Sequence, residues 1–213
     1  MNQNAEQQCQ LAELFKTPER NAFIASYISH RCLVPLTEVS RIGKTAIDDF
    51  LASGVRNFFF VGCCAQSVCK SSFYQPLFDY LLALKKECGI RVGSILNYRK
   101  HSPAFNEFDK SWLIAKDSSL FYKQIACGAQ YILCSYTPQQ QKQSALLNAM
   151  KSANQNVVIR NIDQEYSHES SSFLLKHIAH GDLDIERLYL QVHAQLRPIG
   201  QKQLEELLWK VSK

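Results

Sequence analysis

The polar residues of this chain with catalytic or ligand-binding potential follow short apolar runs. His30, Cys64, Ser135 and Asp163 each stand at or just after the end of such a run, and His101 lies in a polar stretch after another. Histidine and carboxylate side chains are the usual general acids and bases. Asp163 is therefore the candidate catalytic acid, and its structural alternative is to cap a helix or turn, a position that aspartate also favours.

Cysteines form a second group at these positions. Five of them fall at or just after the ends of apolar runs, with His101 and His193 as further possible metal ligands: Cys32, Cys63, Cys64, Cys69 and Cys134. Zinc needs sulfur and nitrogen ligands that converge. The sequence has no CxxC pair. Cys63 and Cys64 are adjacent, and neighbouring side chains on a strand point to opposite faces, so these two would not converge on one metal ion. We therefore favour buried, apolar cysteines over a metal site.

Alternating strands and helices must position these residues. Six apolar runs of strand length occupy residues 22–29, 57–62, 90–96, 130–135, 157–162 and 187–192. Segments with helical spacing stand before, between and after them, at 11–20, 37–53, 73–88, 113–127, 139–154, 170–180 and 201–211. Continuous apolar runs alternating with helices predict a parallel sheet. It is either an open doubly wound sheet or an incomplete (β/α)8 TIM-type barrel with about six strands, and both bind ligands at the carboxyl ends of their strands.

Composition excludes several classes of function. The chain has 213 residues, of which 46% are hydrophobic and 20% charged, and a net charge of +5. Its basic residues are scattered, which argues against nucleic-acid binding. We see no apolar signal segment and no run long enough to span a bilayer, so we expect a cytoplasmic protein with reduced thiols. The familiar glycine-rich phosphate loops are absent from the sequence.

The order of the strand-end motifs resembles a known family. His30-Arg31-Cys32 ends the first run, Gly54-Val55-Arg56-Asn57 leads into the second, and the stretch 97–103 follows the third. Lys116-Asp117 then leads through Lys123 to Gly128-Ala129-Gln130. Over residues 29–135 this order resembles the methylenetetrahydrofolate reductases, flavin-dependent (β/α)8 barrels of one-carbon metabolism. The resemblance implies a helical extension at 1–21 and a barrel-like domain at 22–213 that lacks the family's first two strands.

The resemblance also implies roles for particular residues. His30 corresponds to a histidine that contacts the flavin, and His101, Asp117 and Lys123 correspond to residues around the ribityl chain and phosphates of FAD. Cys64 stands where the family has the aspartate of an Arg-Gly-Asp strand end, and Ser135 where it has a glutamine that contacts folate. The implied function is a divergent, shortened reductase-like protein that binds flavin or a folate-like ligand. Whether it is an FAD-dependent oxidoreductase stays open, because the family's glutamate acid has no counterpart.

Two alternatives remain beside this interpretation. The first is a catalytically inactive relative that acts through protein contacts at its open sheet edges, which a homo-oligomer would also cover. The second is an unrelated α/β enzyme that uses the cysteines for metal chemistry. For the leading hypothesis we expect a small-molecule partner, no nucleic acid and no membrane.

Overall fold

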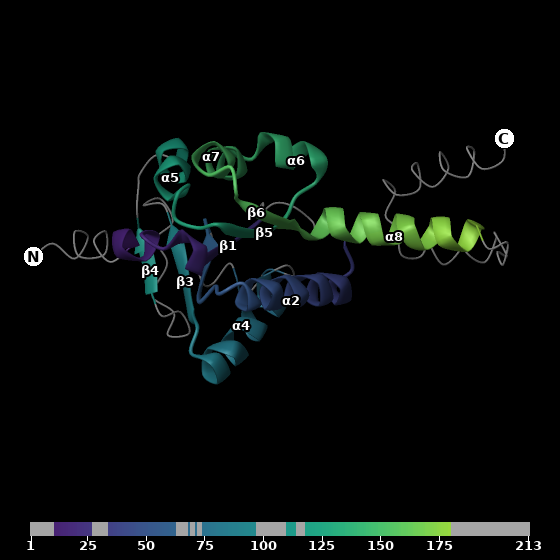
Figure 1. Ribbon diagram of the computed structural model, residues 1–213, viewed down its shortest axis with the longest axis horizontal. Helices are drawn as coiled ribbons and strands as arrows, with labels where there is room; N and C mark the ends of the chain where they lie inside the picture. Colours follow the sequence, from purple (N-terminus) through teal and green to yellow (C-terminus); the bar gives the residue numbers. More distant parts are fainter. Residues whose placement is uncertain are drawn as a thin grey trace, which may run out of the picture.

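The strands of this chain form one parallel sheet with helices on both faces (Figure 1). The computed structural model of the chain describes residues 11–26, 34–62, 68, 71, 74–96, 110–113 and 118–179. Six strands lie within these residues, in the order β4-β3-β2-β1-β5-β6. Their bounds are β1 Asn21–Ser26, β2 Asn57–Val61, β3 Arg91–Leu96, β4 Lys110–Leu113, β5 Tyr131–Ser135 and β6 Val158–Asn161.

Five of the predicted strands are confirmed as β1, β2, β3, β5 and β6. The sixth, at 187–192, lies outside the described residues. The structure adds β4, a four-residue strand that pairs with β3 from Gly93↔Lys110 to Leu96↔Leu113. This strand was not predicted because Lys110-Ser111-Trp112-Leu113 is short and half polar, and an edge strand needs no continuous apolar run.

The predicted parallel α/β sheet is confirmed, whereas the predicted incomplete barrel is not. In a barrel each strand lies beside the next one in the chain. Here the chain passes from β4, at one edge, to β5 on the far side of β1. β1 is thus the central strand of an open order, and it pairs with both β2 and β5. This is the doubly wound sheet, the other of the two predicted architectures.

One face of the sheet is covered by α2 (Leu36–Ala52), α4 (Tyr74–Cys88) and the start of α8 (Ile162–Ala179). α2 contributes a stripe of buried residues at helical spacing, among them Val39, Ile42, Ala46 and Phe50. These pack with inward-facing strand residues of β1, β2, β3 and β5 in a single hydrophobic cluster. The face therefore carries the connections β1–α2–β2 and β2–α4–β3.

The opposite face is covered by α5 (Ser118–Ile125) and α7 (Ala145–Ala153), with α6 (Pro138–Gln143) beside them (Figure 1). Its cluster takes the alternate residues of the same strands. Phe59 belongs to this cluster, while Phe58 and Phe60 belong to the other, and all three are fully buried. The three consecutive aromatic side chains therefore pack on both faces of the sheet.

Helix boundaries depart from the predictions at three places. α5 is Ser118–Ile125 where a helix at 113–127 was predicted, and Leu113 ends β4 instead. Ser144 separates α6 from α7 by capping the second helix through Leu147 N, where one helix at 139–154 was predicted. α8 begins at Ile162, directly after β6, rather than near residue 170. The sequence predicted Ile162 as the last residue of a strand because it is apolar. In the structure Ile162 is buried because it packs against α2. None of the described helices is long and apolar enough to cross a bilayer.

A buried asparagine joins the elements at the amino ends of the central strands. The Asn21 Nδ2 group donates to the carbonyl oxygens of Leu14, at 2.7 Å, and Gly128, at 2.8 Å. Its Oδ1 accepts a hydrogen bond from Asn57 Nδ2 at 2.7 Å. Asn21 is fully buried, so these bonds satisfy a side-chain amide that burial would otherwise penalise. They fix residues 11–20, part of the predicted helical extension, to β1, β2 and the turn before β5.

We expect Asn21→Ala to lower the free energy of unfolding by about 2–4 kcal/mol, because it leaves two carbonyl groups and the Asn57 amide without this partner. Urea denaturation measures the change. Asn156→Ala is the matched control, since Asn156 is exposed and donates to Asn154 Oδ1 through its backbone N–H, which alanine keeps. We expect the control to stay within about 0.5 kcal/mol of the parent. Equal denaturation midpoints for Asn21→Ala and the parent would contradict the role of this network.

Candidate functional site

The sheet reverses its direction of growth between β1 and β5. The chain leaves β1 for α2 on one face and leaves β5 for α6 on the other. The two strands are direct neighbours, and their last residues, Ser26 and Ser135, are in register. In open α/β sheets ligands bind outside the carboxyl ends of the strands at such a switch point. The topology therefore directs attention to the residues that follow β1, β5 and β6.

Ser135 and Asp163 meet at this edge of the sheet. Ser135 ends β5, Asp163 lies in the first turn of α8, and the Ser135 hydroxyl donates to Asp163 Oδ1. Ser135 is fully buried, and Asp163 keeps only 8% of its surface exposed. Asp163 does not occupy the residue before the helix, where a capping side chain would stand. Its carboxylate in the first turn is stabilised by the helix dipole.

Asn161 fixes the loop that leaves β5. Its Oδ1 accepts from the backbone N–H of Tyr136 at 3.1 Å, and its Nδ2 donates to the Tyr136 carbonyl oxygen at 2.8 Å. Asn161 is buried at the end of β6. This pair of bonds holds the β5–α6 connection against β6. Ser135 on one strand and Asp163 after the other are thereby kept side by side.

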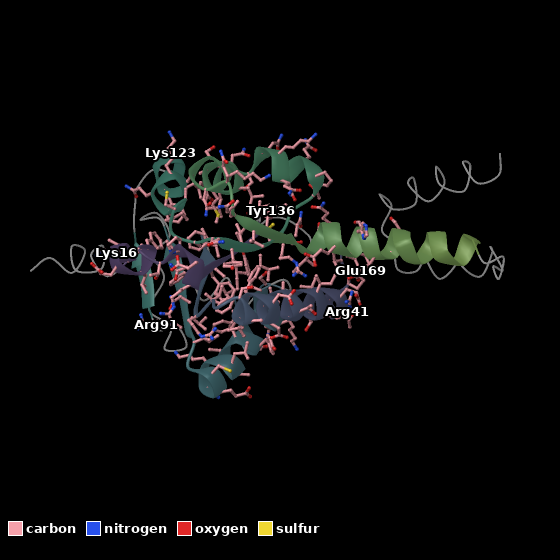
Figure 2. The ribbon with its side chains drawn as sticks, in the orientation of Figure 1. Lys16, Arg41, Arg91, Lys123, Tyr136 and Glu169 are labelled. Atoms are coloured by element: carbon pink, nitrogen blue, oxygen red, sulfur yellow. The ribbon has the colours of Figure 1, made fainter. Side chains whose placement is uncertain are left out.

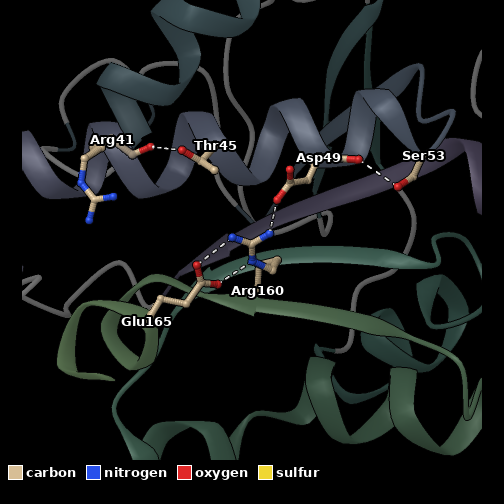
Figure 3. Close-up of polar contacts among 6 residues, drawn as sticks. All are labelled: Arg41, Thr45, Asp49, Ser53, Arg160 and Glu165. Atoms are coloured by element: carbon tan, nitrogen blue, oxygen red, sulfur yellow. Dashed lines mark hydrogen bonds and ion pairs between the residues drawn. The ribbon is translucent and has the colours of Figure 1, made fainter. Parts of the chain in front are cut away.

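An arginine on β6 holds the first turn of α8 (Figure 3). Arg160 donates from Nε to Glu165 Oε1 at 2.6 Å and from Nη2 to Glu165 Oε2 at 2.8 Å, a bidentate pair. Its Nη1 also donates to Asp49 Oδ2 on α2 at 2.5 Å. Hydrogen bonding to Glu165 first, and then to Asp49, raises the pKa of Arg160 above its ordinary value. The guanidinium is therefore a permanent cation that joins β6, α2 and α8.

Of the predicted site residues, the structure brings Ser135 and Asp163 together. Lys123 is exposed in the last turn of α5, a helix that ends shortly before the amino end of β5. Figure 2 shows Lys123 on α5, well separated from Tyr136 just after the carboxyl end of β5. His30, Cys64, His101 and Asp117 lie outside the described residues.

Of the five cysteines at the ends of apolar runs, Cys134 is the one within the described residues. It is fully buried within the apolar cluster under α5 and α7. Burial, and then the negative charge of Asp163, raises the pKa of the Cys134 thiol above its ordinary value. A buried, protonated thiol neither binds metal nor attacks an electrophile readily. No group of residues within the described part of the chain could hold a metal ion.

Two residues of this edge were missed from the sequence: Asn161 and Arg160. Asn161 precedes Asp163 in the chain, and an amide that closes an apolar strand is a signal for a buried polar contact. Arg160 interrupts the run Val157-Val158-Ile159 and could have marked β6 as an outer strand, which it is among the described strands. Neither signal says which loop or helix the side chain reaches.

No protein-family model, curated protein or solved structure matches this chain. The site must therefore be interpreted from its own geometry.

We expect Cys134 in the native protein to react with a thiol reagent at pH 8 at least about 100-fold more slowly than the exposed Cys88 and Cys127. Burial denies the reagent access and keeps this thiol protonated. Timed alkylation followed by peptide mass spectrometry measures the three rates. In urea Cys134 should react like the others, which is the internal control. Fast labelling of Cys134 in the native protein would instead favour the alternative in which the strand-end cysteines carry metal chemistry.

Proposed function

We propose that this chain binds a hydroxyl-bearing, nucleotide-like small molecule at the carboxyl edge of its sheet, with flavin as the first candidate. The single observation that supports this is the switch point between β1 and β5, where the chain leaves neighbouring strands toward opposite faces. Asp163, a charged group beside that point, keeps 8% of its surface exposed. A carboxylate there can accept hydrogen bonds from ribose or ribityl hydroxyl groups.

The described residues fit one part of a flavin and not another. Asp163 offers a carboxylate, which suits the polyhydroxyl chain, and the fully buried Ser135 hydroxyl holds that carboxylate in place. A carboxylate repels phosphate, and Lys123, the expected phosphate contact, lies toward the other end of β5. These residues therefore supply no hydride-transfer step. The roles of His30, His101 and Asp117 around FAD, and of Cys64 and Ser135 toward a folate, stay predictions, as does reductase activity itself.

A second candidate function is that of a protein-interaction module. Among the described strands, β4 and β6 each pair with one neighbour only. β6 carries Val158, which is 38% exposed, beside the charged Arg160. An open strand edge can pair with another chain. A homo-oligomer joined at β6 would show as a doubled mass in light scattering.

We expect the purified protein to bind FAD or FMN, and Asp163→Asn to weaken that binding about tenfold. A hydrogen bond to a charged acceptor contributes about 1.5–3 kcal/mol, and 1.4 kcal/mol corresponds to a factor of ten in Kd. Quenching of flavin fluorescence measures Kd. A folate should be titrated in parallel by equilibrium dialysis.

Asp79→Asn is the matched control, because Asp79 is an exposed carboxylate on α4, away from this edge. Lys123→Ala tests the predicted phosphate contact separately. If neither the flavins nor the folate bind, the proposal is wrong. If Asp163→Asn leaves the Kd unchanged, the ligand binds at a site other than the one beside Asp163.

A further inference from the structure

We propose that Arg160 is a positioning residue for the ligand site, acting through the first turn of α8 to hold Asp163 at the carboxyl edge of the sheet. This inference rests on the proposed function, because Asp163 is the residue that it positions. The inference rests on one short segment, in which β6 leads directly into α8. This segment contains Arg160, Asn161, Asp163 and Glu165.

The direction of the Arg160 side chain follows from the register of the sheet. Arg160 lies opposite Leu133, which belongs to the cluster under α2. Side chains in register share a face of the sheet, so Arg160 faces α2. There it meets Asp49, and it also reaches Glu165 on the first turns of α8. Arg160 and Glu165 each keep 26% side-chain exposure, so water screens their pair only in part.

This bidentate pair fixes the turn that carries Asp163. Two parallel N–H···O bonds from a planar guanidinium fix orientation as well as distance, which a single bond does not. Glu165 stands two residues after Asp163 on the same turn. Ile162, at the start of the turn, is buried against α2, where its Cδ1 lies 3.5 Å from the Cβ that a side chain at Gly43 would have. Packing places the start of the turn, and Arg160 sets its rotation.

A second arginine makes a comparable bridge at a distance from the site. Arg41 on α2 donates to Glu38, at 2.8 Å, and to Glu169 on α8. Glu169 lies six residues beyond Asp163, about 9 Å along the helix axis. Arg41 thus joins the same two helices without touching the first turn of α8. It is the natural comparison for Arg160.

The test is a double-mutant cycle on flavin affinity in the full chain, with amide hydrogen exchange as a second readout. We expect Arg160→Gln to weaken FAD or FMN binding about tenfold in the parent and to have little further effect when Asp163 is already asparagine. Arg41→Gln should leave the affinity within about twofold. Thermal unfolding of both arginine variants checks that each is folded.

Hydrogen exchange separates this inference from the proposed function. In the protein without ligand, Arg160→Gln should speed exchange of the amides at 165–167 more than Arg41→Gln does. If no flavin binds but this difference appears, the proposed function fails while the positioning of the turn stands. Equal exchange in the two variants overturns the inference, and so does an affinity loss from Arg160→Gln that is undiminished in the Asp163→Asn background.

Discussion

The chirality of crossover connections governs the rest of this structure. Parallel strands joined by a right-handed crossover place their helix on one face when the sheet grows in one direction and on the other face when it grows the opposite way. From β1 the chain grows through β2 and β3 with α2 and α4 on one face, then returns with α5, α6 and α7 on the other. β1 is consequently covered on both faces and paired along both edges. The switch point beside it follows from this winding and does not depend on any single side chain.

Burying a central strand in this way leaves polar groups to be satisfied at its two ends. At the amino ends Asn21 uses both its amide hydrogens and its carbonyl oxygen within the protein. At the carboxyl ends Ser135 is bonded to Asp163, and Asn161 to the backbone of Tyr136. The two clusters differ in one respect that matters for function. The amino-end cluster is built from neutral amides, whereas the carboxyl-end cluster contains an acidic side chain, and a carboxylate is the kind of group that a ligand hydroxyl can reach.

Prediction from the sequence succeeded where one local pattern decided the outcome. The runs at 57–62 and 130–135 are strands because both of their faces are buried, and continuous apolar composition records that directly. It failed where residues distant in the sequence determine which element a residue packs against. Nothing local in Ile162 says that it packs on α2 and not in a strand, and nothing local in the chain after β4 says that β5 returns beside β1. Of the site, parallel strands alone predicted that Ser135 and Asp163 lie at the same edge of the sheet. Their contact, like that of Asn161 with Tyr136, depends on the pairing of β5 with β6, which the sequence did not predict.

The start of α8 shows why charge, and not apolar packing, is well suited to hold this edge together. The helix follows β6 without an intervening loop, so its first turn has no flexible segment through which to adjust. Its apolar contacts with the core come from Ile162 and from the partly buried Tyr166, and apolar contacts resist separation far more than rotation. A fork of two N–H groups on one carboxylate resists both. Because Arg160 is itself fixed by the β5–β6 register, the orientation of α8 is tied to the sheet. The side chain at the carboxyl edge, Asp163, is thereby placed by the same strands that create the switch point.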